Sequence, residues 1–300
     1  MAEDGFKKTV AVIGLGLLGT SLAMALKAKG ATVTGWARRR EVRNWAVEQQ
    51  IISATDDEAE AVLASAAVTV ICLPIPEIVA FVSAHAHAWH PGAIVTDIGS
   101  VKEVIVTAGE AALTPRGVHF VGSHPMAGTE KSGPGNAFPE LYNHAEVFIT
   151  RTARTDAAAL SRVRQLWELI GTSIVEIDPV AHDNLVAHTS HISHLLALSL
   201  TEAVLDCDEE LRPLRYSGCA TGFRDTSRIA SSSPKMWREI IENNQTAVLD
   251  TMREFERRWH HLRTIIETGD FDAFEAEFAK GKTLRDAWIA YKNRTRNCGW

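Results

Sequence analysis

One polar, glycine-rich segment holds the residue types best suited to acid–base chemistry. Residues 123–133 read SHPMAGTEKSG and follow the short apolar run 118–121, which is typical of a buried strand. The carboxyl ends of strands in an open parallel sheet face the ligand crevice, so this segment should line a site. Pro125 restricts the backbone just after His124 and helps to hold the imidazole in one place. We therefore predict that His124 moves a proton.

Two further groups of residues have spacings that suit the binding of an acidic substrate. Residues 222–230 read GFRDTSRIA, and the three-residue step would let Asp225 orient the guanidinium of Arg228 toward a substrate carboxylate. Four polar residues fall near one face of a predicted helix, namely His188, Ser190, His191 and His194. Two structural interpretations stay open. Asp225 and Arg228 could form an ion pair without a substrate, and the histidines could be buried in the core. A metal site is a weaker alternative, because no suitable i, i+4 pair with a carboxylate is evident.

A dinucleotide site is predicted near the start of the chain. The apolar run 9–13 leads into GLGLLG at 14–19, and a helix is predicted over 20–29. Strand, GxGxxG and helix are the context that this fingerprint requires, and a glycine-rich turn without a cofactor is the alternative. The residues expected to contact the dinucleotide are Gly14, Gly16, Leu17, Leu18, Gly19, Ala37, Arg38, Arg39, Leu73 and Pro74.

The end of the second predicted strand, 31–36, favours NADP over NAD. An acidic residue there would bind the ribose 2′-hydroxyl, but the chain has Ala37 followed by Arg38, Arg39 and Arg40. The missing carboxylate removes repulsion, and an arginine could bind a 2′-phosphate through two hydrogen bonds. NAD stays possible, because these arginines could simply be the solvated first turn of the next helix.

Alternating strands and helices predict an α/β fold for residues 1–178. Repeated β-α units indicate a Rossmann-type, doubly wound parallel sheet with helices on both faces, which would form the NAD(P)-binding domain. Helices are expected over 75–89 and 156–170. Three histidines near the first of these are interpreted as solvated surface, not as metal ligands: His85, His87 and His90. The further strands are expected at 68–73, 93–97, 118–121, 146–150 and 173–177.

From Asp178 onward the pattern is helical, so residues 179–300 are predicted to form an all-helical second domain. Asp178 suits a helix N-cap and Pro179 the first turn. Long helices are expected over 181–206 and 234–268, and apolar residues recur along both at steps of three and four. Such wide apolar stripes need partners. We therefore predict a homodimer formed through these helices, with a self-contained bundle as the alternative.

The composition limits the expected partners and location. The net charge is −6, from 31 basic and 37 acidic residues, so we expect neither nucleic acid nor a membrane as partner. No apolar run approaches the roughly 18 residues of a membrane span. No signal pattern begins the chain, and the four cysteines show no CxxC. We expect a cytoplasmic protein with reduced thiols and no metal.

Taken together, these motifs resemble those of the prephenate and arogenate dehydrogenases of tyrosine biosynthesis. The resemblance covers nearly the whole chain, and its specific part is the HPMAG loop combined with the arginine motif. The motifs that carry it are GLGLLG at 14–19, DIGSVK at 97–102, GSHPMAGTEKSG at 122–133, HD at 182–183, SHISH at 190–194 and GFRDTSRIA at 222–230.

The resemblance implies a nucleotide-binding domain, a helical dimerisation domain and an active site in the cleft between them. It makes His124 the catalytic base. Ser100 would contact the substrate by a hydrogen bond to its hydroxyl, or would orient His124. His194 would lie on the substrate side, and Arg228 would bind a carboxylate. Further substrate contacts are expected from Thr129, Glu130, His191 and Asp225.

The expected reaction is oxidative decarboxylation with hydride transfer to NAD(P)+. Prephenate would give 4-hydroxyphenylpyruvate, and arogenate would give tyrosine; both substrates stay open. We expect kcat/KM to fall in acid near a histidine pKa of about 6.5, unless that pKa is shifted. Feedback through an appended regulatory domain is not expected. The alternatives are a 4-amino-4-deoxyprephenate dehydrogenase, an NADP-dependent β-hydroxy acid dehydrogenase, and a non-catalytic NADP(H)-binding sensor.

Overall fold

The computed structural model describes residues 9–128 and 131–295 of the 300-residue chain. The chain divides into two compact units, Met1–Gln245 and Thr246–Trp300. The first unit contains two β-sheets and the helices that pack on them, and the second is helical. The domain boundary expected after residue 178 stays a prediction. Within the described residues, no helix is both long and apolar enough to cross a membrane.

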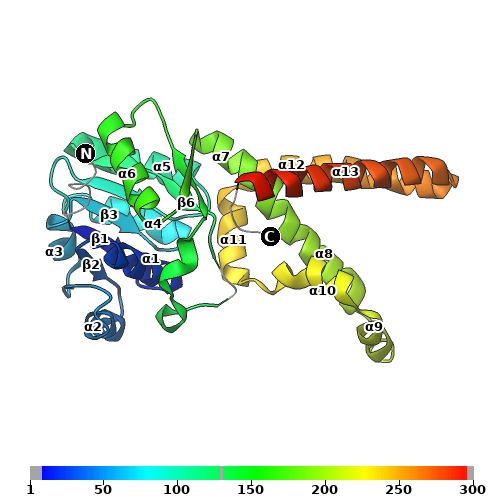
Figure 1. The fold of residues 1–300 in the computed structure, drawn as a ribbon, viewed down its shortest axis with the longest axis horizontal. Coiled ribbons are helices and arrows are strands. Elements are labelled where there is room, and N and C mark those ends of the chain that lie inside the picture. The colour runs from blue at the N-terminus through cyan, green and yellow to red at the C-terminus, as the bar shows by residue number, and fades with distance from the viewer. Residues whose placement is uncertain (1–8, 129–130, 296–300) are drawn as a thin grey trace. The chain divides into compact units, whose positions relative to one another are not determined.

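A five-stranded parallel sheet lies at the centre of the first unit (Figure 1). Its order is β2-β1-β3-β4-β5, so the chain turns to one side of β1 to form β2 and to the other side to form β3. At such a reversal a ligand crevice opens beyond the carboxyl ends of the strands. The strands are β1 (Val10–Ile13), β2 (Val33–Trp36), β3 (Val68–Ile71), β4 (Ile94–Asp97) and β5 (His119–Val121).

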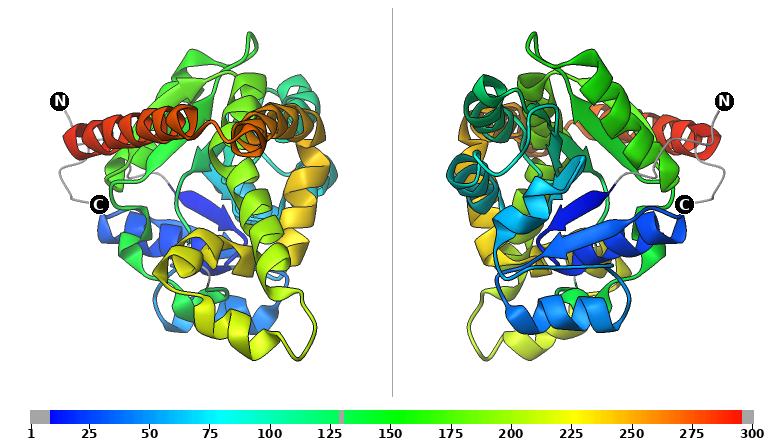
Figure 2. Two further views of the ribbon diagram at one scale, coloured as in Figure 1. Left: turned by 90° about the vertical axis from the view of Figure 1, so that its right-hand side faces the viewer. Right: turned by 90° about the vertical axis from the view of Figure 1, so that its left-hand side faces the viewer.

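Helices cover both faces of this sheet (Figure 2). Val10 and Val12 point into one buried cluster, which includes residues of α1 and α6. Ala11 and Ile13 point the other way, into a cluster with residues of α4 and α5. This arrangement confirms the predicted doubly wound α/β fold. The helices are α1 (Leu17–Ala28), α2 (Arg40–Glu48), α3 (Ala59–Ala64), α4 (Ile75–Ala84), α5 (Glu103–Leu113) and α6 (Ala157–Leu169).

A second, three-stranded sheet corrects part of the prediction. The strands expected at 146–150 and 173–177 are present as β7 (Glu146–Thr150) and β8 (Ser173–Ile177), but they lie outside the parallel sheet. They pair with β6 (Ser123–Pro125), which the polar composition had suggested was a loop. Long-range antiparallel pairing with β7 makes this segment a strand. The passage from β5 to β6 is tight: a Cβ on Gly122 would lie 2.5 Å from Thr150 Oγ1.

The predicted helix over 181–206 is continuous but contains a π-helical turn. It consists of α7 (Pro179–Val186), the π-turn Ala187–His191 and α8 (Ile192–Leu205). Asp178 is the expected N-cap, because its carboxylate accepts from the backbone N–H groups of residues 180 and 181. The chain continues through α9 (Arg212–Gly218), α10 (Thr221–Ser227) and α11 (Pro234–Asn243). Short 3-10 turns occupy Thr114–Arg116, Pro134–Asn136, Pro139–Tyr142 and Arg228–Ser231.

The single helix predicted over 234–268 is wrong, because the chain leaves helical geometry at Asn244. This residue has φ −137° and ψ 31°, and it separates α11 from α12 (Gln245–Thr268). A further helix, α13 (Phe271–Thr295), follows. In the described part of residues 179–295 the chain forms helices and no strand, as predicted. Both α12 and α13 carry exposed apolar side chains, including Trp259, Ile266, Phe278 and Leu284.

Candidate active site

The glycine turn between β1 and α1 fits a dinucleotide. Gly14 has φ +99°, and a Cβ on it would lie 2.4 Å from the carbonyl oxygen of Cys72. A Cβ on Gly19 would lie 1.9 Å from the Gly14 carbonyl oxygen, so the turn itself requires both glycines. Gly16 differs, because a Cβ there would meet nothing within 4 Å. Gly16 is exposed at the N-terminus of α1, where backbone N–H groups can face a pyrophosphate.

The other expected cofactor contacts surround this turn in different ways. Leu73 borders Gly14, since a Cβ on Gly14 would lie 2.9 Å from Leu73 Cδ2. Pro74 is exposed and precedes α4. Leu17 is buried, and the carbonyl of Leu18 accepts a hydrogen bond of 3.0 Å from a tyrosine hydroxyl. Leu73 therefore borders the turn and the exposed Gly16 leaves it open to a ligand, while cofactor contacts of Leu17, Leu18 and Pro74 stay predictions.

The segment after β2 carries exposed arginines on a braced loop. Arg38 and Arg39 are exposed, and Arg38 pairs with a glutamate of α4 at 3.6 Å. Beneath them Arg43 is only 6 % exposed, and its Nη1 donates to the carbonyl of Ala37 at 2.7 Å. Its Nη2 donates to Asp57 at 2.5 Å. Arg43 was not singled out in the sequence, and it fixes the loop that presents the other arginines.

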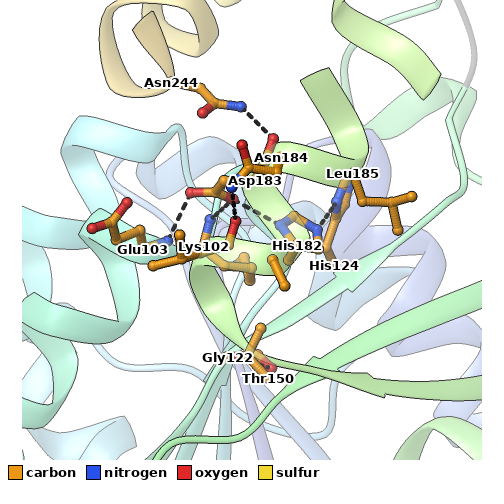
Figure 3. A network of polar contacts seen from close by, with 12 residues as sticks. Lys102, Glu103, Gly122, His124, Thr150, His182, Asp183, Asn184, Leu185 and Asn244 are labelled. Atoms are coloured by element: carbon orange, nitrogen blue, oxygen red, sulfur yellow. Dashed lines mark hydrogen bonds and ion pairs between the residues drawn. The ribbon is translucent and has the colours of Figure 1, made fainter. Parts of the chain in front are cut away.

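His124 lies on β6 and begins a chain of three polar side chains (Figure 3). Its Nδ1 is 2.9 Å from Nε2 of His182, and Nδ1 of His182 is 2.7 Å from Oδ1 of Asp183. The carboxylate of Asp183 accepts backbone N–H groups from Lys102, at 2.7 Å, and from Glu103, at 2.9 Å. These two N–H groups belong to the N-terminus of α5, where a helix stabilises negative charge.

This arrangement fixes the tautomers of both histidines. A carboxylate only accepts hydrogen bonds, so Nδ1 of His182 carries its proton toward Asp183. In neutral His182, Nε2 is then an acceptor, and Nδ1 of His124 must donate to it. The proton of neutral His124 therefore lies on Nδ1, and its Nε2 has a free lone pair. His124 presents the acceptor nitrogen that a general base needs.

The surroundings keep His124 and His182 neutral. Burial lowers the pKa of His124 well below its ordinary value, and the nearby His182, Lys102 and His191 lower it further. Burial also lowers the pKa of His182, against the opposing effect of its hydrogen bond to Asp183. Both imidazoles are therefore unprotonated at neutral pH, and His124 can accept a proton.

A buried ion pair holds the strand that carries His124. Lys102 and Asp97 are fully buried and paired, and Lys102 Nζ also donates to the carbonyl of Ser123 at 2.9 Å. Asp97 in turn accepts from the backbone N–H of Ser123 at 3.1 Å and from that of Gly99 at 2.7 Å. The pair thus clamps both backbone groups of the residue that precedes His124.

The π-turn in the α7–α8 helix reduces the angle about the helix axis between His182 and His194. In an uninterrupted α-helix the twelve residues from His182 to His194 would turn the side chain by about 120°, and one extra residue in a π-turn reduces this to about 20°. Side chains support the turn, because His188 Nδ1 donates to the Asn184 carbonyl and Thr189 Oγ1 to that of Leu185.

The residues predicted to lie on the substrate side have different surroundings in the structure. His191 is 2 % exposed, and the ring of His194 packs at a tilt against Trp237 with ring centroids 4.0 Å apart. The 3-10 turn that begins at Arg228 packs on α8, which carries His194, and after burial the charge of Arg228 helps to lower the pKa of His194. The expected pairing of Asp225 with Arg228 is wrong: Asp225 pairs instead with its exposed neighbour Arg224, whose Nε lies 3.0 Å from Oδ1 of Asp225.

Some predicted contacts stay as predictions. Thr129 and Glu130 lie outside the described residues. Ser100 lies partly buried in the loop after β4, and within the described chain the residue that orients His124 is His182.

His85, expected to be solvated, pairs with Glu60 at 2.8 Å. Across residues 9–128 and 131–295, no cluster of His, Cys, Asp and Glu has the arrangement of a metal site.

Reasoning from sequence missed several residues of the site. Four of them stand in motifs that had been noted, but nothing in those motifs indicated which residues would meet, and Trp237 and Asn244 stand outside the motifs. His182 and Asp183 form the HD pair, and Asp97 and Lys102 begin and end DIGSVK. The missed residues are Asp97, Lys102, His182, Asp183, Trp237 and Asn244.

Comparisons with known proteins agree with this architecture. The family profile described as "Prephenate dehydrogenase, nucleotide-binding domain" matches residues 22–176. The profile described as "Prephenate dehydrogenase, dimerization domain" matches residues 178–280. The prephenate dehydrogenase of Bacillus subtilis (strain 168) is 34 % identical over 286 residues, which are 93 % of this chain and 76 % of that protein.

Solved structures show the same likeness. The arogenate dehydrogenase of Synechocystis superimposes with a TM-score of 0.84 and 29 % identity, over 93 % of this chain and 99 % of that one. The prephenate dehydrogenase of A. aeolicus, in complex with hydroxyphenyl propionate and NAD+, gives a TM-score of 0.82 and 30 % identity, over 95 % of this chain and 98 % of that one. The chain therefore belongs to the prephenate dehydrogenase family.

Proposed function

We propose that the protein catalyses the NADP-dependent oxidative decarboxylation of prephenate or arogenate. The observation that carries the proposal is the His124–His182–Asp183 chain, which leaves Nε2 of His124 as an acceptor. Both substrates share a cyclohexadienol ring with a hydroxyl and a ring carboxylate. The relatives above act on one or the other, as their names state.

The residues of the chain supply a base and a means of positioning the substrate. Nε2 of His124 accepts the proton of the ring hydroxyl as hydride leaves the same carbon. When bound, oxidised nicotinamide supplies the hydride acceptor. The bond between the ring and its carboxylate then breaks, CO2 departs, and the electron pair of that bond makes the ring aromatic, while the proton held by His124 returns to the oxygen that becomes the phenol hydroxyl. Because aromatisation drives the reaction, the protein needs mainly one base and a fixed geometry.

The charge of the substrate indicates where the other residues act. Arg228 is exposed and lies near His194, so its guanidinium can hold a substrate carboxylate through two hydrogen bonds. Ser100 follows β4 on the loop that leads to Lys102, and we propose that its hydroxyl contacts the substrate hydroxyl. Thr129 and Glu130 are proposed substrate contacts on the basis of the family motif alone.

The preference for NADP rests on the segment after β2. Ala37 offers no carboxylate to a ribose 2′-hydroxyl, and Arg38 and Arg39 are exposed beside it. A 2′-phosphate would find positive charge there and no repulsion. The A. aeolicus relative was solved with NAD+, so the two cofactors need to be compared directly on this protein.

A homodimer is the proposed assembly. The matching profile of the second half is described as a dimerization domain, and α12 and α13 expose large apolar side chains, such as the 72 % exposed Phe278. Exposed apolar patches of this kind commonly mark interfaces. Sedimentation at micromolar concentration should give twice the 32.8 kDa chain mass. A monomer under those conditions would contradict the proposal.

One assay tests the proposed reaction. Purified protein is mixed with prephenate or arogenate and with NADP+ or NAD+, and reduced nicotinamide is followed by absorbance. We expect turnover with at least one substrate, a higher kcat/KM with NADP+, and a loss of roughly 10²- to 10⁴-fold in kcat for His124→Asn. No turnover with any combination would refute the function. Full activity of His124→Asn would refute the assignment of the base.

A further inference from the structure

Asn244 joins two parts of the α7–α8 helix from outside it. It is 7 % exposed and lies at the break between α11 and α12 (Figure 3). Its Nδ2 donates to the backbone carbonyl of Asp183 at 2.8 Å, and the same Nδ2 lies 3.3 Å from Nδ1 of His191. One side-chain amide therefore contacts the residue that ends the His124 chain and a second buried histidine.

These contacts fix the amide and then the imidazole. A backbone carbonyl only accepts hydrogen bonds, so the atom of Asn244 that faces Asp183 is the NH2 group and not the oxygen. The second N–H of that group lies at Nδ1 of His191. Nδ1 of His191 is therefore the acceptor, and the proton of the neutral ring lies on Nε2.

The site around His191 favours a neutral donor. Burial lowers the pKa of His191 to about 4, with His182 and His194 adding to the effect and Asp183 opposing it. The His191 ring meets Trp237 edge to face, with centroids 5.8 Å apart. Within the described chain, Nε1 of Trp237 is buried and has no hydrogen-bond partner. Two rings in contact thus each carry an N–H donor, which suits a ligand that brings acceptor oxygens.

We propose that Asn244 is a positioning residue that holds His191 as a neutral Nε2–H donor to an acceptor oxygen of the substrate. The proposal rests on the proposed function. It assigns opposite tasks to two neutral histidines: His124 presents an acceptor because His182 takes its Nδ1 proton, and His191 presents a donor because Asn244 occupies its Nδ1. Asn244→Asp should reverse the second assignment, because a carboxylate would draw the proton to Nδ1 of His191.

The tautomer can be measured without turnover. Full-length protein with 15N-labelled histidine rings is examined by two-bond 1H–15N correlation, and His191 is identified by loss of its signals in His191→Gln. We expect a protonated Nε2 and an unprotonated Nδ1 in the wild type, and a protonated Nδ1 in Asn244→Asp. Asn243→Asp is the matched control, because Asn243 donates to a carbonyl of its own helix at 2.8 Å. A protonated Nδ1 in the wild type would overturn the proposal.

Steady-state kinetics test whether the donor meets the substrate. For Asn244→Asp we expect KM to rise roughly 10- to 100-fold with a smaller change in kcat, as when one hydrogen bond to a carboxylate is lost. Asn244→Gln, which keeps the NH2 group, should recover part of the loss, and Asn243→Asp should behave as wild type. Unchanged KM in a folded Asn244→Asp protein with the reversed tautomer would overturn the proposed contact between His191 and the substrate. Absence of wild-type turnover would instead refute the proposed function and leave the tautomer result standing.

Discussion

Nδ1 of His124 lies 2.9 Å from Nε2 of His182, and this contact determines which nitrogen of His124 can act as a base. His182→Phe should keep the packing of the ring, which meets Phe148 edge to face at 5.6 Å, while removing the acceptor for His124 Nδ1. His124 would then lose its fixed tautomer and orientation. We expect kcat to fall roughly 10- to 100-fold, less than for His124→Asn, and the free energy of unfolding to fall by about 1 to 3 kcal/mol because Asp183 loses a buried donor. Unchanged kcat would show that His182 does not position the base.

The glycine turn allows cofactor binding to be separated from folding. Gly16→Ala places a methyl group in open space, where only a ligand would meet it, so the fold should be unaffected while KM for the cofactor rises roughly tenfold or more. Gly19→Ala places the methyl group 1.9 Å from the Gly14 carbonyl oxygen and should destabilise the protein itself. Thermal unfolding and cofactor titration of both variants check this. Equal losses of stability in Gly16→Ala and Gly19→Ala would contradict the assignment of Gly16 to cofactor binding and of Gly19 to the fold.

Local patterns predicted the parts of the fold that depend on neighbouring residues. The strand, GLGLLG and helix near Gly14 are contiguous, so each could be recognised from its own segment. β6 could not, because the polar residues around His124 become a strand only by pairing with β7. The break at Asn244 was missed for a similar reason: its side chain bonds to Asp183, 61 positions away.

The candidate site shows the same division. His124 stood out through its motif, but its orienting partner His182 lies 58 positions along the chain, and no spacing rule connects them. Lys102 was noted only as the end of the DIGSVK motif, and nothing in the sequence indicated that it is fully buried against Asp97. The three-residue helical step predicted that Asp225 pairs with Arg228, but the carboxylate of Asp225 pairs with Arg224 instead. Pairwise contacts across the fold were therefore the part that the sequence alone could not specify.

The residue after β2 offers a test of cofactor preference. Ala37→Asp introduces the carboxylate that would bind a ribose 2′-hydroxyl and repel a 2′-phosphate. We expect the ratio of kcat/KM for NADP+ to that for NAD+ to fall roughly 10- to 100-fold, which corresponds to about 1.4 to 2.8 kcal/mol. Ala37→Asn is the matched control, since it has the same size without the charge. A ratio that does not change in Ala37→Asp would mean that the 2′ position is recognised elsewhere.

The buried pair of Lys102 and Asp97 should matter for stability. Lys102→Met leaves the Asp97 carboxylate buried without its cation, which typically costs about 3 to 5 kcal/mol in the free energy of unfolding. Removing both charges in Lys102→Met with Asp97→Asn should restore part of the loss. Lys282→Met, at an exposed pair with Asp286, should change stability by less than about 1 kcal/mol. Urea unfolding measures all three, and a Lys102→Met loss as small as that of Lys282→Met would contradict the structural role.

The pH dependence of kcat/KM tests the electrostatic setting of His124. The base must be neutral, so activity is retained above its pKa in the free enzyme and is lost as pH falls through that pKa. Burial, together with the neighbouring His182, Lys102 and His191, lowers this pKa well below its ordinary value. We therefore expect kcat/KM to stay constant from neutral pH down through the ordinary histidine pKa of about 6.5, and to fall only in more acidic solution. Activity recovered on return to neutral pH separates this titration from unfolding. An inflection of kcat/KM at about pH 6.5 or above would contradict this, because it would mean that solvent or a negative charge offsets the effect of burial on the pKa of His124.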